Sequence, residues 1–285
     1  MKIGFIGQGW IGRNYADDFE NRGYEIVRYS LEEPYLQNKA AIASCDITFL
    51  AVPTPTTPAG FNDSFVIDAL TNIGKENIAV IKSTTIPGLV ARLQEKFPDI
   101  IVLHSPEFLV EKTAAYDAAH PNRNIIGIPI DNDTYREAAQ KVLAVLPIAP
   151  YNNVMNSLDS ELVKYAGNCF LYTKVLFINT LYDLVEKSSG SWDDVREALI
   201  NDPRIGESHT NPIYDTGRGA GGHCFIKDFE AFRQHYRDVV VEDEAFAMMS
   251  AQVMYNNSLL IKSNKDIDLL RGVYGDEAVD STQKF

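Results

Sequence analysis

The chain has 285 residues, of which 45% are hydrophobic and 23% are charged, so it can bury a large core and is long enough for two domains. This composition excludes disordered and fibrous proteins, and no run reaches the roughly 20 apolar residues of a membrane span. The 39 acidic and 26 basic residues give a net charge of -13, which disfavours nucleic acid as a partner. With no apolar signal segment at its start, the chain is expected to be a soluble, cytoplasmic protein without a membrane partner.

Short apolar runs alternate with helical segments through the first half of the chain. The first run, Lys2–Ile6, is broken by Gly7, and a helix is predicted over Trp10–Asn21. Uniformly apolar strands separated by helices indicate a parallel sheet covered on both faces. We therefore predict an α/β fold with a Rossmann-like, doubly wound domain over residues 1–150. Its other strands are expected at Tyr24–Tyr29, Asp46–Val52, Ile78–Lys82, Ile100–Leu103 and Ile125–Ile128, and its other helices at Phe65–Ile73, Leu89–Lys96 and Asp133–Leu146.

The period changes at Asn156, and the second half is predicted to be mainly helical. A long helix is expected to run to about Lys187, with a second helix from near Ser191. A glycine-rich loop, Gly217–Gly222, then precedes helical sequence that we place from Asp228 onward. The prediction is a helical domain over 151–272, followed by a polar, acidic tail over 273–285 that is expected to fray.

A glycine loop between the first strand and the first helix predicts a dinucleotide site. Gly7 permits the tight turn, Gly9 lets the backbone approach a pyrophosphate, and Gly12 allows close packing of helix and strand. The N-terminus of the helix then faces the phosphate charge. The residues expected to contact the cofactor here are Gly7, Gln8, Gly9, Trp10, Ile11 and Gly12.

The end of the second predicted strand leaves NAD and NADP both open. The acid that normally holds the ribose 2′-hydroxyl is missing, and Ser30 can bond either a hydroxyl or a phosphate. Arg28 can attract a 2′-phosphate or lie in solvent as a strand-end charge, whereas Glu32 or Glu33 can replace the missing acid one turn later.

Polar segments that can carry chemistry follow the next three strands, and a fourth lies in the helical half. In open α/β sheets ligands bind at the carboxyl ends of the strands. The long helix also has a polar face, with Glu161, Lys164 and Asn168 spaced i, i+3 and i+7 and Asn179 further along. Such groups on an apolar helix need partners or a function if they are buried. The segments are VPTP from Val52, KSTTIPG from Lys82, SPEFLVE from Ser105 and GGHCFIKD from Gly221.

Together these segments resemble the UDP-glucose/GDP-mannose dehydrogenase family. Its members carry, in this order, a nucleotide loop, a VxTP turn, a KSTxxPG strand end, an NPEFLxEG loop, a KxxxN helix, a DPRIG segment and a GGxCFxKD loop. Every element occurs here, including DPRIG from Asp202, and the match covers nearly the whole chain. The departures are Ser105 for the usual Asn, Lys112 for a Gly and Arg218 for an aromatic residue.

The resemblance implies NAD-dependent oxidation of the C6 alcohol of a nucleotide sugar to a carboxylate. In this scheme Cys224 forms a thiohemiacetal and then a thioester, and His223 and Lys227 can favour its thiolate. Lys164 and Asn168 are expected to stabilise the oxyanion, and Glu107 is the expected base, with Thr84 and Asp228 positioning water. Cys45 and Cys169 are expected to be buried thiols, and no cysteine or histidine cluster suggests a metal site.

The resemblance also implies the remaining contacts. The cofactor, taken as NAD with NADP still open, is expected to contact Ser30, Val52, Pro53, Thr54, Thr84 and Glu111. The nucleotide sugar is expected to contact Glu107, Phe108, Leu109, Glu111, Lys164, Asn168, Arg204 and Gly221. The long helix, with apolar Leu162, Ala166, Phe170, Phe177 and Leu181, is expected to form a homodimer in which Arg204 reaches the partner's sugar.

Length is the largest departure from the family pattern. Family members carry a third, UDP-binding domain, and we expect this chain to be a short form without it, either a truncated chain or a natural short form. Two other hypotheses stay open: a two-electron 3-hydroxyacid-type dehydrogenase that has no need for the thiol, and a non-catalytic module that keeps the fold.

Overall fold

The computed structural model describes residues 1–280, and the chain divides into two compact units. The first unit contains Met1–Thr54 and Asn62–Lys164, and the second contains Pro55–Phe61 and the chain from Tyr165 onward. The predicted boundary near residue 150 lies before this division, because a further strand and the first two turns of the long helix belong to the first unit. A short excursion of the N-terminal half also belongs to the second unit, which no local pattern indicated.

The first unit is built on a seven-stranded sheet with the order β2-β1-β3-β6-β7-β8-β9. Four of these strands are buried over all or nearly all of their length, as expected for strands covered on both faces. The predicted parallel pairing is confirmed from β2 to β7, but β7 and β8 pair antiparallel. The bounds are β1 Lys2–Ile6, β2 Glu25–Tyr29, β3 Ile47–Leu50, β6 Ile78–Ile81, β7 Ile101–His104, β8 Arg123–Ile128 and β9 Tyr151–Asn156.

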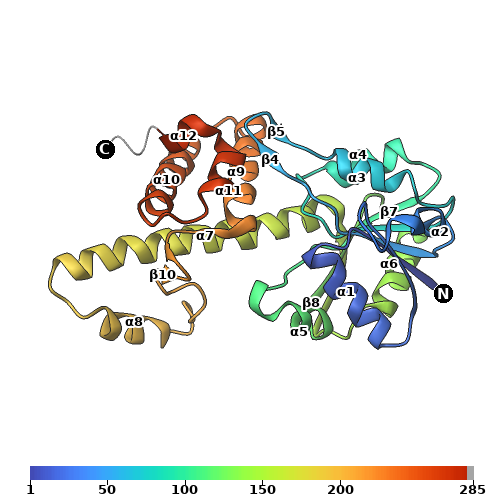
Figure 1. Cartoon of the computed structure of the whole chain (residues 1–285), viewed down its shortest axis with the longest axis horizontal. Coiled ribbons are helices and arrows are strands. Elements are labelled where there is room, and N and C mark those ends of the chain that lie inside the picture. The colour runs from blue at the N-terminus through green and yellow to red at the C-terminus, as the bar shows by residue number, and fades with distance from the viewer. Residues whose placement is uncertain (281–285) are drawn as a thin grey trace. The chain divides into compact units, whose positions relative to one another are not determined.

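Helices cover both faces of this sheet, which confirms the doubly wound fold (Figure 1). Alternate strand residues such as Phe5 and Phe49 pack with Phe19 of α1 and with α5 and α6, while α3 and α4 lie on the opposite face. A side chain at Gly12 of α1 would come within 1.9 Å of the Gly7 carbonyl oxygen, so this helix packs closely on the first turn. The helices are α1 Trp10–Asn21, α2 Lys39–Ile42, α3 Ser64–Leu70, α4 Leu89–Lys96, α5 Ala114–Ala119 and α6 Asp133–Val145, with 3-10 turns at Leu36–Asn38 and Glu111–Thr113.

The second unit is mainly helical, as predicted. Its core includes Tyr172 of the long helix stacked on Phe229 at a centroid distance of 3.9 Å. The hairpin formed by β4 (Thr56–Thr57) and β5 (Gly60–Phe61) packs against α9, and β4 also packs against α11. The other elements are α7 Ser157–Lys187, α8 Trp192–Ile200, β10 Ile213–Tyr214, β11 Gly217–Arg218, α9 Gly222–Val239, α10 Asp243–Lys262, α11 Ile267–Tyr274 and α12 Asp276–Asp280.

Two predictions about the second half are wrong. Helix α9 begins at Gly222 instead of near Asp228, so the GGHCFIKD segment forms its first two turns. Residues 273–280, expected to fray, are largely helical because Val273 and Val279 are buried with Leu270. The rest of the predicted tail, 281–285, lies outside the described residues. Over residues 1–280 no helix combines the length and hydropathy needed to cross a bilayer.

Candidate functional site

The carboxyl edge of the sheet carries the first group of candidate residues. The chain leaves β1 toward β2 on one side and later returns to β3 on the other, and ligands bind at such a reversal in open α/β sheets. The glycine loop follows β1, and the VPTP, KSTTIPG and SPEFLVE segments follow β3, β6 and β7. The sheet topology therefore places all four segments at one edge of the first unit.

The glycine loop fits a dinucleotide. Gly7 has a φ of +90°, and a Cβ there would lie 2.3 Å from the Ala51 carbonyl oxygen, so only glycine is accommodated. At Gly9, by contrast, a Cβ would meet no atom within 4 Å, which leaves open space where a pyrophosphate can approach. No side chain caps the start of α1, and the buried Oε1 of Gln8 has no hydrogen-bond partner. These free polar groups match the needs of a bound phosphate and its ribose.

The end of β2 shows that Arg28 does not serve as a phosphate ligand. Its guanidinium donates to Asp17 at 2.6 Å and to Glu20 at 2.7 Å, and its side chain is 10% exposed. It is therefore neither the solvated charge nor the 2′-phosphate partner that the sequence left open. Ser30 closes a local turn, because its hydroxyl donates to the carbonyl oxygen of Glu32 at 2.9 Å.

Ser83 ties the VPTP turn to the next strand end. Its hydroxyl accepts from the amide of Val52 at 3.0 Å and donates to the Val52 carbonyl oxygen at 2.7 Å. Thr54 is buried beside this turn and Pro53 is exposed, while Thr84 is partly buried. The strand ends are thus fixed to one another before any ligand binds.

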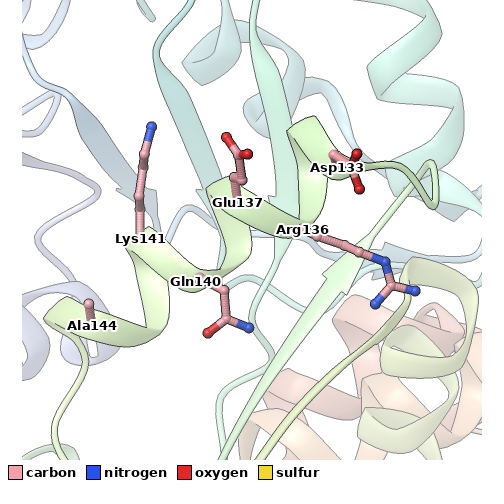
Figure 2. A pocket seen from close by; sticks show the side chains of 6 residues that line it. All are labelled: Asp133, Arg136, Glu137, Gln140, Lys141 and Ala144. Atoms are coloured by element: carbon pink, nitrogen blue, oxygen red, sulfur yellow. The ribbon is translucent and has the colours of Figure 1, made fainter.

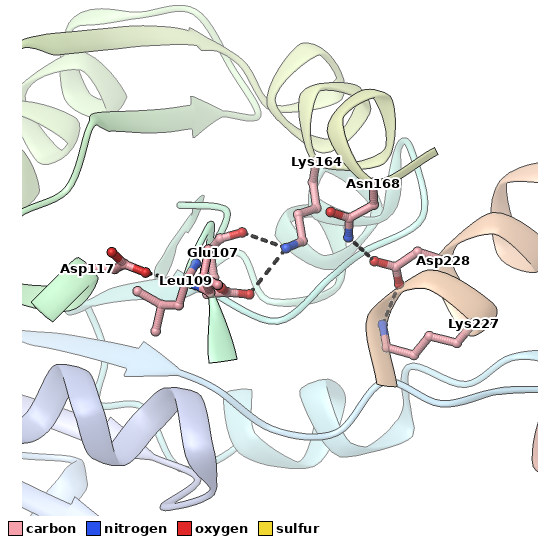
Figure 3. Close-up of polar contacts among 8 residues, drawn as sticks. Glu107, Leu109, Asp117, Lys164, Asn168, Lys227 and Asp228 are labelled. Carbon is pink, nitrogen blue, oxygen red and sulfur yellow. Dashed lines mark hydrogen bonds and ion pairs between the residues drawn. The ribbon is translucent and has the colours of Figure 1, made fainter. Parts of the chain in front are cut away.

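Lys164 and Glu107 form the central pair of the first unit, as Figure 3 shows. The Lys164 ammonium donates to the Glu107 carbonyl oxygen at 2.6 Å and to its carboxylate at 3.2 Å, and both side chains are nearly fully buried. The same carboxylate accepts from the amide of Leu109. Phe108 lies between Glu107 and Leu109 in the sequence. The guanidinium of Arg123 lies over the Phe108 ring, 3.8 Å from its centroid. This loop is therefore held in one conformation by three different contacts.

A second set of buried polar residues lies in the first unit, and the sequence predicted no role for any of them. The Lys82 ammonium donates to Ser105 at 3.1 Å and lies over the ring of Tyr15, and burial lowers the pKa of Lys82 to about 8. Burial also lowers the pKa of His104 to about 3, so this ring is neutral. Glu161, placed correctly on the polar helix face, accepts from the amides of Gly88 and Val90 and so caps α4.

The second group of candidate residues lies in the second unit. Cys224 is exposed and lies in the first turn of α9, whereas Cys45 and Cys169 are buried, as expected. Asp228 lies one turn further along α9 and is 1% exposed. Its carboxylate accepts from Asn168 at 2.6 Å and pairs with Lys227 at 2.5 Å (Figure 3).

Arg204 and Glu111 are exposed and take no part in these two groups. The Arg204 guanidinium pairs with Asp202 at 2.6 Å, and the Lys174 ammonium donates to the carbonyl oxygens of Ile205 and Gly206, which fixes this loop to α7. Gly221 immediately precedes α9.

The first unit also has a shallow hollow along α6, and the residues that line it belong to a solvent-exposed helix face. Figure 2 shows charged and polar side chains from successive turns of this one helix, and all of them are exposed. No buried polar group points into it to bind a ligand. Its lining residues are Asp133, Arg136, Glu137, Gln140, Lys141 and Ala144.

Comparison with known proteins identifies the family of the chain. Residues 32–145 match the NAD binding domain of the UDP-glucose/GDP-mannose dehydrogenase family, and residues 159–258 match its central domain. The chain belongs to this family. The prediction of NAD as cofactor is confirmed at the level of this domain.

Individual relatives of the family share much of the chain. A UDP-glucose 6-dehydrogenase of Rickettsia felis is 36% identical over 228 residues, covering 75% of this chain and 48% of the relative. A UDP-glucose 6-dehydrogenase of Bacillus subtilis is 31% identical, and the match covers 87% of this chain and 56% of the relative. A solved UDP-glucose dehydrogenase of Pyrobaculum islandicum superposes with a TM-score of 0.77 at 26% identity, covering 95% of this chain and 70% of that one. The chain spans about half the length of the first curated relatives that it matches.

Proposed function

We propose that the protein oxidises the C6 hydroxyl of a nucleotide sugar, of the UDP-glucose type, to a uronic acid with two NAD. The family match and the names of the relatives support the reaction class. The observation that carries the proposal is the placement of Cys224, the exposed thiol of the three, on the same helix face as Asp228 and one turn before it. A two-electron dehydrogenase has no use for a thiol at this position.

The Cys224 thiol divides the oxidation of the C6 alcohol to the acid into two hydride transfers and one hydrolysis. NAD, when bound, accepts a hydride in each of the two oxidations, of the alcohol and then of the thiohemiacetal. Between them, the sulfur of Cys224 adds to the aldehyde carbon, and the carbonyl oxygen takes a proton. Water then cleaves the resulting thioester, which releases the acid and restores the thiol. The net reaction consumes one alcohol, two NAD and one water, and yields one acid, two NADH and two protons.

Residues of the first unit serve as the base and its partner. Glu107 removes the proton of the C6 hydroxyl, and Lys164, whose ammonium contacts both the carboxylate and the main chain of Glu107, balances the charge that develops on oxygen. The Glu107 carboxylate also accepts from the Leu109 amide, so it is held in a fixed orientation. Thr84, at the end of β6, assists in positioning water.

Residues of the second unit act on the thioester. Asp228 orients the hydrolytic water, and its own orientation is set by Asn168 and Lys227. Asn168 also donates to the oxyanion, since its amide nitrogen carries two protons and Asp228 takes only one. Lys164 and Asn168 are four residues apart on α7, so one helix presents both donors.

A homodimer completes the proposal. Phe170, Phe177 and Leu184 recur every seven residues on α7 and are 69%, 61% and 62% exposed. Leu162 and Ala166 are also exposed, and Leu181 is partly buried. An apolar stripe of this kind is characteristic of a surface that another helix covers. In the dimer, Arg204 reaches the sugar bound by the partner.

Turnover with a panel of UDP- and GDP-sugars tests this function. The purified chain is incubated with NAD and each sugar, and the product is identified by mass spectrometry. Formation of a uronic acid supports the proposal, whereas an aldehyde or a ketone as the final product identifies a two-electron dehydrogenase. Absence of any product with every sugar and with a set of 3-hydroxyacids, at protein concentrations that bind NAD, identifies a non-catalytic module.

A further inference from the structure

Helix α9, which begins two residues before Cys224, is capped by a residue distant in sequence. Its N-cap residue is Gly221, which has no side chain to accept from the first amides of the helix. The carboxylate of Asp266 performs this role instead and accepts from the amide of Gly222 at 2.7 Å. Because 44 residues separate the two groups, the start of the helix depends on the turn between α10 and α11.

Gly221 is a glycine because Asp266 occupies the space beside it. A Cβ on Gly221 would lie 2.1 Å from the Asp266 Oδ2 and 2.9 Å from the Cε of Lys265. Contacts of that length are excluded, so the close approach of the carboxylate requires glycine. The first glycine of the GGHC segment therefore has a structural partner within the second unit.

The turn that carries Asp266 is itself held on both sides. Lys265 is 8% exposed, and its ammonium donates to the carbonyl oxygen of Tyr214 at 3.1 Å, which fixes it to β10. On the other side, Leu270 of α11 packs with Ile226 of α9 in one buried cluster. The hydrogen bond of Lys265 on one side and the packing of Leu270 on the other thus hold the Asp266 carboxylate at the start of α9.

The charges around the first turn of α9 come from three elements. His223 and Lys227 lie on α9 itself, and Lys227 is already paired with Asp228. The turn between α10 and α11 supplies Lys265 and Asp266. Burial lowers the pKa of Lys265, and Asp266 together with Asp215 of the hairpin turn opposes this shift. The β4 and β5 strands, which also pack against α9, have no charged residue.

A carboxylate at the N-terminus of a helix offsets its positive end. That positive end would otherwise favour the anionic form of a thiol in the first turn, as in helices that carry reactive cysteines. A negative charge bonded there disfavours a second negative charge nearby. A carboxylate at this place would have two effects on a thiol in the first turn: it would fix the turn, and it would lower the fraction of thiolate.

We propose that Asp266 is the positioning residue of Cys224, holding the first turn of α9 in place while keeping the thiol mostly protonated. Only the description of Cys224 as the nucleophile rests on the proposed function. The effect on the thiol itself belongs to the second unit, with or without substrate and cofactor.

Alkylation of Cys224 by iodoacetamide tests this role without turnover. The rate of alkylation at Cys224 is measured on the full chain by peptide mass spectrometry, at about pH 7 and about pH 9.5. The rate at about pH 7 divided by the rate at about pH 9.5 reports the fraction of thiolate at neutral pH. The neutral reagent is not attracted by charge. Asp266→Asn keeps an oxygen acceptor for Gly222 and removes the charge. For the variant, the rate at about pH 7 divided by the rate at about pH 9.5 is expected to rise about three-fold or more, an order-of-magnitude figure for the loss of one nearby charge.

Asp268→Asn is the matched control, because Asp268 is exposed two residues further along and the charge change is the same. Its ratio is expected to equal that of the wild type. Should Asp266→Asn fail to fold, Asp266→Ser supplies a neutral acceptor at the same position. An unchanged ratio in the folded Asp266 variant overturns the proposal. A raised ratio in a protein that oxidises no sugar supports the role of Asp266 and rejects the proposed function alone.

Discussion

Asn168 donates a hydrogen bond of 2.6 Å to Asp228, joining α7 to α9 between residues 60 positions apart. Asp228 is 1% exposed, so this bond and the ion pair with Lys227 provide its buried carboxylate with partners from within the chain. The contact holds the helix that carries Cys224 against the long helix. It is therefore both a stabilising contact and the geometric basis of the proposed hydrolysis step.

Removing this amide should destabilise the second unit. Asn168→Ala leaves the buried carboxylate of Asp228 short of one donor, and the free energy of unfolding in urea is expected to fall by about 1–3 kcal/mol. Asn168→Asp should cost more, since it places a second carboxylate against the first. Asn201→Ala is the control, because the Asn201 amide donates to a carbonyl oxygen on an exposed helix end. Equal unfolding free energies for Asn168→Ala and Asn201→Ala would contradict this account.

The glycine loop predicts a matched pair of variants. Gly9→Ala adds a methyl group to open space, so the melting temperature should stay unchanged while the affinity for NAD falls at least ten-fold. Gly12→Ala brings a methyl group to 1.9 Å from the Gly7 carbonyl oxygen, so both the melting temperature and the affinity should fall. Calorimetry and thermal unfolding measure the two quantities. Unaltered NAD binding by Gly9→Ala would show that the pyrophosphate does not approach this residue.

Glu161 predicts a pH dependence of stability. Burial raises its pKa to about 7 from the ordinary value of 4.5, although the amides of Val90 and Gly88 oppose this shift. Between these two values the folded state binds more protons than the unfolded chain, so this group makes stability fall as the pH rises, by up to about 3 kcal/mol. His104, with its pKa lowered to about 3, acts in the opposite direction below pH 6.5, so a comparison with a variant is needed.

Urea unfolding of the wild type and Glu161→Gln at about pH 5 and pH 8 isolates this contribution. The wild type should lose more stability than the variant between the two pH values, because glutamine does not titrate. Parallel changes in the two proteins would show that Glu161 is ionised throughout this range.

The apolar stripe on α7 predicts the oligomeric state. Light scattering of the wild type at micromolar concentration should give twice the 31.8 kDa chain mass, and Phe177→Asp should reduce this to the monomer. Val239→Asp is the control, since Val239 is 65% exposed at the end of α9 and off the stripe. A wild-type mass of 31.8 kDa would exclude the dimer and the role of Arg204 across it.

The sequence predicted elements well where the signal is local. Helices α1 and α4 and strand β1 begin and end as expected, because apolar periodicity and flanking glycines mark their bounds. The start of α9 was missed because Gly221 and Gly222 look like a loop, and the carboxylate that caps the helix at Gly222 comes from Asp266. The β4 and β5 hairpin was missed because its packing partners lie in the other half of the chain.

The candidate site shows the same limit. Lys164, Asn168, Glu107, Asp228 and Cys224 could be proposed from motifs, but the motifs do not show which of them touch. Their pairing joins residues 57 and 60 positions apart, and only the folded chain brings such residues together. Lys82 was noted only as part of the KSTTIPG motif, and His104 gave no signal beyond its place at a strand end. Their contacts depend on burial that no single segment determines.

The most direct test of the central claim is the number of NADH formed per acid, compared between the wild type and Cys224→Ser. The account predicts two NADH for each uronic acid in the wild type. The variant should bind NAD with unchanged affinity, because the glycine loop lies in the other unit, yet release no acid. One NADH per ketone in the wild type, or acid formed by Cys224→Ser at near the wild-type rate, would contradict the covalent role of Cys224.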